Sequence, residues 1–311
     1  MPRHIILMPN WIGDFLIALA VVMRRKAEDE HTTLLVPEYL ADLCRKMTDL
    51  PLIPYARKTK KDYKRTISII RRRQFDCITL LPHSFSSARL AFHSRIPKRV
   101  GLNTEFRGFF LTQRLPAALR TKSKHILSMY AHLLSTSVWS PEQWDGAGIA
   151  NVPQKKYKDT VVLCPGAMYG PAKRWPYFSH LAEKLDQRIV VIGTADDWEE
   201  GERIKNTAPE RVQNLCGKTT LIEAAEIISS ANVVISNDSG LMLMAGFLGT
   251  RVIGIFGSTS PVWTHPLGNN SVAIQQKQPC APCFARKCKF GHYKCLREIS
   301  VDEVLKKIKS E

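Results

Sequence analysis

The chain has 311 residues, of which 44% are hydrophobic and 23% are charged, values typical of a globular enzyme with one large or two medium domains. Its formal net charge is +17. Residues 1–155 carry 25 Lys and Arg against 12 Asp and Glu, a net charge of +13, whereas residues 156–311 carry 20 against 16, a net charge of +4. The basic excess in the N-terminal half indicates a partner with several negative charges: nucleic acid, an anionic membrane surface or a phosphorylated substrate. A merely basic protein without such a partner is the alternative.

The beginning of the chain does not show the pattern of a signal peptide or of a membrane span. The apolar run after Arg3 and His4 is short, and Phe15–Met23 cannot cross a bilayer. We therefore expect a cytoplasmic protein whose eight cysteines stay reduced. Four of them lie scattered in apolar stretches and are expected in the core: Cys44, Cys77, Cys164 and Cys216.

The first half alternates strands and helices. Apolar and β-branched runs predict strands at His4–Met8, Thr32–Val36, Phe75–Leu81 and Lys98–Gly101. Amphipathic patterns predict helices at Asp14–Arg25, Tyr39–Lys46, Asp62–Arg73, Ser84–His93 and Lys124–Ser137.

The second half repeats this alternation after a segment rich in Pro, Gly, Gln and Lys at Ser140–Asp159, which predicts an interdomain linker. Strands are expected at Thr160–Cys164, Arg188–Ile192, Val233–Ser236 and Arg251–Phe256. Helices are expected at Pro176–Leu185, Trp198–Asn206, Leu221–Ser229, Leu241–Leu248 and Val301–Lys309. Thr219 or Thr220 can cap the third of these helices, with Glu223 in its first turn.

This order predicts an α/β protein with two Rossmann-like, doubly wound parallel sheets, one in residues 1–150 and one in residues 151–311. A ligand is expected in the cleft between them, outside the carboxyl ends of the strands.

The stretch Asn232–Gly257 predicts a strand, a polar turn at Asn237–Gly240, a helix and a second strand. Gly249 stands where the helix would end. Free backbone N–H groups and the positive end of the helix dipole would then face the ligand cleft. We expect an anion or a sugar to bind there.

Two loops carry candidate catalytic groups. Asp14 follows the first strand and is either a helix-capping residue or a carboxylate able to accept a proton from a substrate hydroxyl. The loop Pro165–Pro176 has two glycines and adjacent Lys173 and Arg174, which form either a phosphate clamp or a pair of solvated cations. The loop is neither a Walker A nor a GxGxxG motif.

Two further segments remain open. The acidic run Gly193–Glu202 either accepts hydrogen bonds from ribose hydroxyls or simply begins a helix. Four cysteines within sixteen residues resemble a structural zinc site with irregular spacing, although locally packed reduced thiols are the stronger reading: Cys280, Cys283, Cys288 and Cys295. His292 lies inside this cluster.

Together these segments resemble one family, the lipopolysaccharide heptosyltransferases of glycosyltransferase family 9, and within it the branch that adds the second heptose. The likeness runs through nearly the whole chain in order and spacing. Its motifs are PNWIGDFLIALAV (Pro9–Val21), LLPHSFSSARLAFHSRIPKRVG (Leu80–Gly101), RGFFLTQRLP (Arg107–Pro116), PGAMYGPAKRWP (Pro165–Pro176), NDSGLM (Asn237–Met242), GIFGSTSPVWTHPLG (Gly254–Gly268) and CAPCFARKCKFGHYKCL (Cys280–Leu296).

The resemblance implies a GT-B fold, with the terminal helix 301–309 packing back on the first domain. It implies inverting, metal-independent transfer of L-glycero-D-manno-heptose from ADP-heptose to the first heptose of the inner core. Asp14 then matches the general base, and Lys173 matches the cation on the departing diphosphate. The other implied donor-site residues are Gly166, Arg174, Glu199, Asp238, Ser239, Gly240 and Leu241.

The basic first domain is expected to hold the anionic lipopolysaccharide acceptor. The residues implied for it are Asn10, Trp11, Gly13, Arg57 and Arg99. We also expect peripheral association with the anionic face of the inner membrane of a Gram-negative cell, a monomer, no nucleic acid and no cofactor. One position departs from the family pattern, because Leu243 stands where relatives usually carry a His.

Two other functions remain as alternatives. One is a family-9 transferase with a different acceptor, such as heptosyltransferase I. The other is a nucleic-acid-binding protein, which the basic charge permits but for which the sequence has no aromatic-interleaved basic motif and no helix-turn-helix signal.

Overall fold

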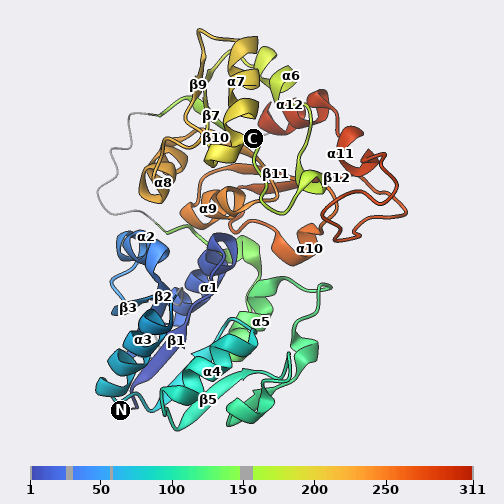
Figure 1. Cartoon of the computed structure of the whole chain (residues 1–311). Helices are drawn as coiled ribbons and strands as arrows, with labels where there is room; N and C mark the ends of the chain where they lie inside the picture. Colours follow the sequence, from blue (N-terminus) through green and yellow to red (C-terminus); the bar gives the residue numbers. More distant parts are fainter. Residues whose placement is uncertain (1, 26–30, 57–58, 148–156, 310–311) are drawn as a thin grey trace. The chain divides into compact units, whose positions relative to one another are not determined.

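The computed structural model describes residues 2–25, 31–56, 59–147 and 157–309. These residues form two compact units, residues 1–139 and 140–311 (Figure 1). Each unit is built on one six-stranded parallel sheet, as the alternation of strands and helices predicts.

The sheet of the first unit has the strand order β3-β2-β1-β4-β5-β6, with every neighbouring pair parallel. Its strands are β1 (His4–Leu7), β2 (Thr32–Pro37), β3 (Leu52–Tyr55), β4 (Cys77–Leu80), β5 (Lys98–Leu102) and β6 (Gln113–Leu115). Its α-helices are α1 (Ile12–Arg25), α2 (Ala41–Met47), α3 (Lys60–Arg72), α4 (Phe85–His93) and α5 (Ile126–Leu133). Short 3-10 turns lie at η2 (Glu38–Leu40), η3 (Gly108–Phe110) and η4 (Ala117–Leu119).

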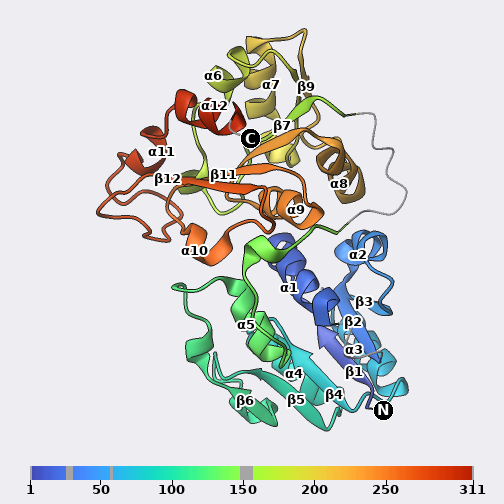
Figure 2. The ribbon, with the colours of Figure 1, turned by 180° about the vertical axis from the view of Figure 1, so that it is seen from behind.

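Apolar packing explains this arrangement. The central strand β1 is buried along its whole length, and α1 buries most of its residues against the sheet. Helices α1 and α5 pack together, as do α3 and α4. The sheet therefore has helices on both faces, which is why its inner strands are nearly continuous apolar runs (Figure 2).

The sheet of the second unit has the order β12-β11-β10-β7-β8-β9, again all parallel. Its strands are β7 (Thr160–Cys164), β8 (Arg188–Val191), β9 (Val212–Asn214), β10 (Val233–Asn237), β11 (Val252–Phe256) and β12 (Ser271–Gln275). Its α-helices are α6 (Phe178–Glu183), α7 (Trp198–Thr207), α8 (Leu221–Ser230), α9 (Gly240–Leu248), α10 (Pro261–Thr264), α11 (Lys294–Arg297) and α12 (Val301–Lys309). Short 3-10 turns lie at η5 (Pro141–Gln143), η6 (Pro171–Lys173) and η7 (Ala195–Asp197).

Local signals that the sequence offers are confirmed at two helix ends. Thr220 and Glu223 form a capping box at the start of α8, with each side chain accepting from the other residue's backbone N–H. Gly249 ends α9 in the left-handed conformation at φ 79°, which a glycine adopts without a steric penalty.

The boundary between the units lies earlier than the expected position at residue 150. Residues from Ser140 onward belong to the second unit, because the indole Nε1 of Trp144 donates to the Phe247 carbonyl at 2.7 Å and the two rings stack. Part of the predicted linker, residues 148–156, lies outside the described residues.

The terminal helix α12 packs within the second unit, against α6 and β11. Val304 is fully buried in the core that contains Trp175 and Ile299, and Asp302 forms an ion pair with Lys184 at 2.8 Å.

In both sheets the chain reverses the direction in which it adds strands. This reversal occurs between β1 and β4 in the first unit and between β7 and β10 in the second. In open α/β sheets, the loops that follow such strand pairs form the ligand site. The loops to consider are therefore those after β1 and β4 and those after β7 and β10.

Candidate active site

The loops after β7 and β10 are joined by the side chain of Asn237, at the end of β10. Its amide Nδ2 donates to the Pro165 carbonyl at 2.6 Å, and its Oδ1 accepts from the Trp175 backbone N–H at 3.0 Å. Asn237 is fully buried. Both ends of the Pro165–Pro176 loop are thereby fixed to β10.

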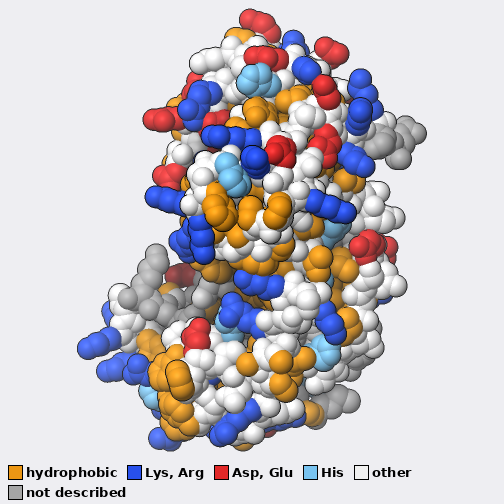
Figure 3. All heavy atoms as spheres, turned by 90° about the vertical axis from the view of Figure 1, so that its right-hand side faces the viewer, with side chains coloured by type: hydrophobic (Ala, Val, Ile, Leu, Met, Phe, Trp, Pro, Cys, Tyr) orange, Lys and Arg blue, Asp and Glu red, His pale blue; other side chains and the backbone are white. Residues whose placement is uncertain are grey.

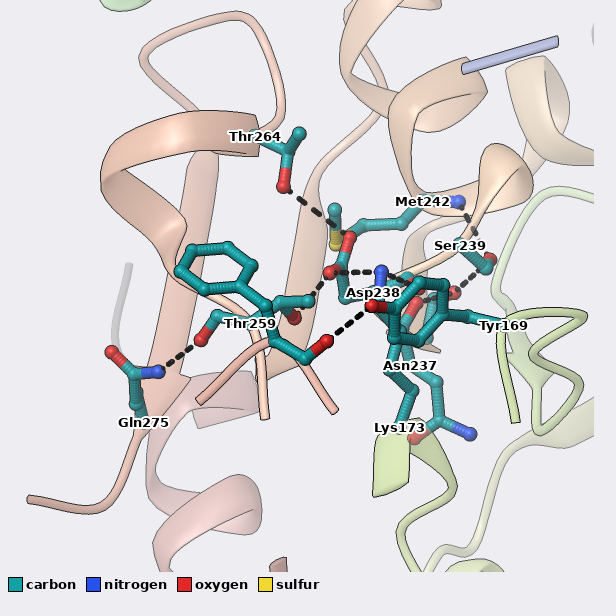
Figure 4. A network of polar contacts seen from close by, with 11 residues as sticks. Tyr169, Lys173, Asn237, Asp238, Ser239, Met242, Thr259, Thr264 and Gln275 are labelled. Atoms are coloured by element: carbon teal, nitrogen blue, oxygen red, sulfur yellow. Dashed lines mark hydrogen bonds and ion pairs between the residues drawn. The ribbon is translucent and has the colours of Figure 1, made fainter. Parts of the chain in front are cut away.

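Asp238 is the centre of the polar network in Figure 4, and its side chain is only 4% exposed. Its Oδ2 lies 2.5 Å from Lys173 Nζ and accepts from Thr259 Oγ1 at 2.5 Å, while Oδ1 accepts from Thr264 Oγ1 at 3.5 Å. Lys173 Nζ also donates to the Asp238 carbonyl at 3.3 Å. A buried carboxylate needs this many donors, since burying an unpaired charge is costly.

Lys173 is 14% exposed and faces an aromatic ring as well as the carboxylate. Its Nζ lies 4.9 Å from the ring centroid of Tyr169, and the guanidinium of Arg286 lies 5.4 Å from the same centroid. The Tyr169 hydroxyl donates to the Phe284 carbonyl, which fixes the ring. The result is a preorganised cation beside a buried acid, at the carboxyl edge of the sheet.

Arg174 does not share this position with Lys173. Its Nη2 lies 2.8 Å from Oδ1 of Asp197, a buried residue whose Oδ2 accepts from the backbone and hydroxyl of Thr194. A Cβ on Gly166 would lie 2.3 Å from Asp197 Oδ2. Gly166 thus leaves room for the Asp197 side chain, and Arg174 neutralises its charge, so this part of the acidic run has a structural role. Glu199 is exposed in the first turn of α7.

The N-terminus of α9 follows Asp238 directly. Ser239 caps the helix by accepting from the Met242 backbone N–H at 3.4 Å, and Gly240 and Leu241 supply the first N–H groups, which have no partner within an α-helix. This end carries the positive part of the helix dipole and suits an anion. Leu243, in the next turn, is 5% exposed and belongs to the apolar part of α9.

In the first unit, Asp14 lies in the first turn of α1, just after β1. The nearby Tyr130 of α5 is buried, and its pKa is raised well above the usual value, first by burial and then by the Asp14 carboxylate; the Arg120 guanidinium acts in the opposite direction. Asp14, Tyr130 and Arg120 therefore share one electrostatic environment at this loop. The sequence singled out only Asp14, because Tyr130 lies in an ordinary apolar helix pattern.

His83, in the loop after β4, is a second residue that the pattern did not single out. Its Nδ1 is buried without a hydrogen-bond partner in the described part of the chain. Its pKa is lowered to about 4, chiefly by burial and also by Arg120 and Arg107. A neutral imidazole therefore stands at the strand reversal of the first unit. The feature of the sequence that could have indicated His83 is its position just after the predicted strand Phe75–Leu81.

The residues implied for the acceptor have different environments. Trp11 is 64% exposed, Gly13 is buried, and the Asn10 side chain accepts from the Tyr55 hydroxyl at 2.8 Å. Arg99 braces a loop instead, since its guanidinium donates at 2.6 Å to the carbonyls of Phe110 and Ile96. Arg57 lies outside the described residues.

Comparisons with known proteins decide the family. The model described as glycosyltransferase family 9 (heptosyltransferase) matches residues 64–294, which is most of the chain. The chain belongs to glycosyltransferase family 9.

Individual relatives of this family-9 protein agree. It is 30% identical to lipooligosaccharide heptosyltransferase 2 of Haemophilus influenzae, covering 87% of this chain and 88% of the relative. It is 26% identical to lipopolysaccharide heptosyltransferase 2 of Escherichia coli, covering 98% and 97%. The solved E. coli ADP-heptose lps heptosyltransferase II superposes with a TM-score of 0.83 at 23% identity, over 98% of this chain and 97% of that one. The GT-B fold implied by the resemblance is thereby confirmed.

The cysteine segment of the family-9 protein does not form a metal-binding set in this structure. No group of three or more His, Cys, Asp or Glu residues that could hold a metal ion occurs among the described residues. The four cysteines line one small pocket of about 30 Å³, together with His292. Burial and the other three thiols raise the pKa of Cys295, whereas backbone N–H groups, that of Tyr293 foremost, lower the pKa of Cys288. The zinc expectation is not supported, and all four thiols are free.

The scattered cysteines are mostly where they were expected. Cys44, Cys164 and Cys216 are buried, and Cys77 is half-buried at the start of β4. No helix within the described ranges is long and apolar enough to span a membrane.

Proposed function

We propose that this family-9 protein transfers L-glycero-D-manno-heptose from ADP-heptose to the first heptose of the lipopolysaccharide inner core, with inversion at the anomeric carbon. The observation that carries the proposal is the Lys173–Asp238 pair, buried at the strand reversal of the second unit and directly before the N-terminus of α9. A cation, a carboxylate and free N–H groups at one sheet edge suit a sugar diphosphate.

The donor would be divided between these groups. Lys173 binds the diphosphate, and the N–H groups of Ser239, Gly240 and Leu241 bind phosphate oxygens. Asp238 accepts hydrogen bonds from heptose hydroxyls. Lys173 already pairs with Asp238, so a bound diphosphate would compete with the Asp238 carboxylate for Lys173 Nζ. The hydroxyls of Thr259 and Thr264 would keep that carboxylate hydrogen-bonded.

Asp14 would act as the general base. An acceptor hydroxyl oxygen attacks the anomeric carbon while the bond from that carbon to the diphosphate oxygen breaks. The hydroxyl proton passes to the Asp14 carboxylate, and ADP leaves with the bonding electron pair. Lys173 stabilises the negative charge that develops on ADP. A single displacement of this kind inverts the anomeric centre.

The first unit would bind the acceptor. Asn10, Trp11 and Gly13 come from the loop that leads to Asp14, and the contacts of Arg99 make Arg120 the better candidate cation. Neutral His83 can donate to or accept from a sugar hydroxyl. Because the acceptor is part of a lipid, we place the reaction at the cytoplasmic face of the inner membrane of a Gram-negative cell.

We further propose that the transfer needs no cofactor or metal ion and no nucleic acid, and that one chain suffices as a monomer. Lys173 and the α9 N-terminus supply the positive charge that a divalent cation supplies in other transferases. Glu199, exposed in the first turn of α7, remains the candidate partner for the ribose.

A panel of nucleotide sugars tests the donor assignment. The protein is incubated with a one-heptose core and ADP-heptose, ADP-glucose or UDP-glucose, and the core is analysed by mass spectrometry. Addition of one heptosyl unit from ADP-heptose alone is expected. Equal transfer from UDP-glucose, or no transfer from ADP-heptose, would contradict the proposal.

A further inference from the structure

Helices α3 and α4 border a basic groove whose lining residues lie outside the candidate active site. The groove has a volume of about 920 Å³ and is lined by Thr59, Lys60, Tyr63, Lys64, Ile67, Ser68, Arg71, Arg72, Arg89 and His93. Five of these residues carry a positive charge and none is acidic. Asp62, on the same helix, is engaged in the capping box with Thr59.

The helical repeat explains why the cations gather. Lys60, Lys64 and Ser68 are four residues apart, and Arg71 and Arg72 lie three and four residues after Ser68, which places them along one side of α3. Lys64, Arg71 and Arg72 are exposed. A row of exposed cations with no facing acid attracts a surface with several negative charges.

An aromatic ridge lies beside the groove and consists of Phe85, Phe92, Phe106, Phe109 and Phe110. Phe106 is 94% exposed, Phe109 63%, Phe92 46% and Phe85 40%. The ring of Phe110 is 5.2 Å from those of Phe85 and Phe92 and 4.1 Å from that of Phe109, so α4 and η3 present these four together. Phe106 follows Glu105, whose Oε2 accepts from the Phe85 backbone N–H at 3.1 Å. Figure 3 shows exposed hydrophobic side chains with Lys and Arg side chains beside them.

We infer that the basic groove and the aromatic ridge together dock on an anionic lipid bilayer. Cations beside exposed aromatic side chains are the combination that binds at a membrane interface, the cations at the headgroups and the rings below them. A soluble anion gains nothing from exposed phenylalanines, whereas a contiguous group of exposed rings beside polar residues marks an interaction surface. This inference rests on the proposed function, because the acceptor of that reaction is carried by a lipid.

The test is co-sedimentation of the full chain with two kinds of vesicle. One is pure phosphatidylcholine, and in the other a quarter of the lipid is phosphatidylglycerol. We expect binding to the anionic vesicles that weakens with salt. Two variants divide the surface: Lys64→Glu with Arg72→Glu changes the groove, and Phe106→Ser with Phe109→Ser changes the ridge. Lys306→Glu with Lys309→Glu, on exposed positions of α12, makes the same charge change elsewhere.

The groove variant should bind anionic vesicles at least about 30-fold more weakly, since each lost cation removes about 1 kcal/mol and each added carboxylate is repelled by the surface. The ridge variant should lose binding that persists at high salt, and the α12 control should bind like the wild type. Thermal melts confirm folding. Wild-type binding by both groove and ridge variants would overturn the inference, as would equal affinity for uncharged vesicles or a preference for a DNA oligonucleotide.

Transfer assays separate this inference from the proposed function. All variants should transfer heptose to a water-soluble, deacylated one-heptose core at the wild-type rate, and the groove and ridge variants should be slower on the acylated core in vesicles. If the wild type does not transfer heptose to the soluble core, the proposed function is wrong. The vesicle-binding results then still decide the docking inference independently. Equal rates on both acceptors in the groove and ridge variants would contradict the docking role.

Discussion

At the scale of single residues, the Lys173–Asp238 pair combines structure and chemistry. The side chains are 14% and 4% exposed, so each neutralises a charge that burial would otherwise penalise. The same lysine is the cation that the proposed reaction needs for the departing ADP. A substrate that competes for Lys173 Nζ therefore weakens the Lys173–Asp238 ion pair, which also holds the Pro165–Pro176 loop in place.

Lys173→Ala should lose nucleotide affinity and turnover, and should also lower the free energy of unfolding by about 3–5 kcal/mol, because Asp238 is left buried without its cation. Calorimetric titration with ADP and thermal melts measure the two effects. Lys184→Ala, which removes the lysine of the exposed pair with Asp302, serves as the control and should alter neither. Unchanged ADP binding by Lys173→Ala would exclude the phosphate role.

Asp14→Asn should reduce turnover by about 10²–10⁴-fold, because the amide cannot accept the acceptor proton. Donor affinity should stay close to that of the wild type, since the second unit is intact. Steady-state kinetics and ADP-heptose titration provide the two numbers. A fully active Asp14→Asn enzyme would rule out the general-base assignment.

At the scale of elements, the sequence predicts the buried strands and misses the exposed ones. The four strands without a prediction are β3, β6, β9 and β12, and each lies at the edge of a sheet. An edge strand has one neighbour and partial exposure, so it does not need a continuous apolar run. Pro54 in β3 and the polar residues of Gln113–Leu115 show this directly.

Gly166 illustrates what a motif cannot reveal. Its loop predicted close approach to a ligand, whereas the structure places Asp197 against it. Gly166→Ala should therefore lower the melting temperature by displacing Asp197 from Arg174. In an Asp197→Ala background the same change should cost less, because the clash is relieved. Additive losses in the double variant would contradict this explanation.

The cysteine segment also yields a prediction. The lowered pKa of Cys288 means that its thiolate is populated at lower pH than that of an ordinary thiol, so it should react first with iodoacetamide near neutral pH. Cys44 and Cys216, whose pKa values are raised to about 12 by burial, should stay unmodified in the folded protein. Peptide mass spectrometry over a pH series measures each site. Modification of Cys44 before Cys288 would contradict the assignment.

At the scale of the whole molecule, the topology indicates where ligands bind, whereas the charge indicates only what kind of partner binds. Two parallel sheets follow from the alternation of apolar runs and amphipathic helices, and the strand reversals then indicate where ligands bind. The positive charge of the first half only implied an anionic partner. The groove and the ridge required coordinates, because Lys64, Arg89 and Phe109 come from three different segments.

Chelation tests another property of the complete enzyme. Because Lys173 and the α9 N-terminus supply the positive charge, EDTA should leave the transfer rate unchanged at saturating donor. The rate is compared with and without added Mg²⁺ in the same buffer. Loss of activity that Mg²⁺ restores would refute metal-independent transfer.

The central claim is addition of heptose to a core that already carries one. Purified protein and ADP-heptose are given two acceptors, one core truncated before the first heptose and one truncated after it, and the products are weighed by mass spectrometry. One added heptose is expected on the one-heptose core and none on the heptose-free core. Transfer to the heptose-free core instead would contradict the claim.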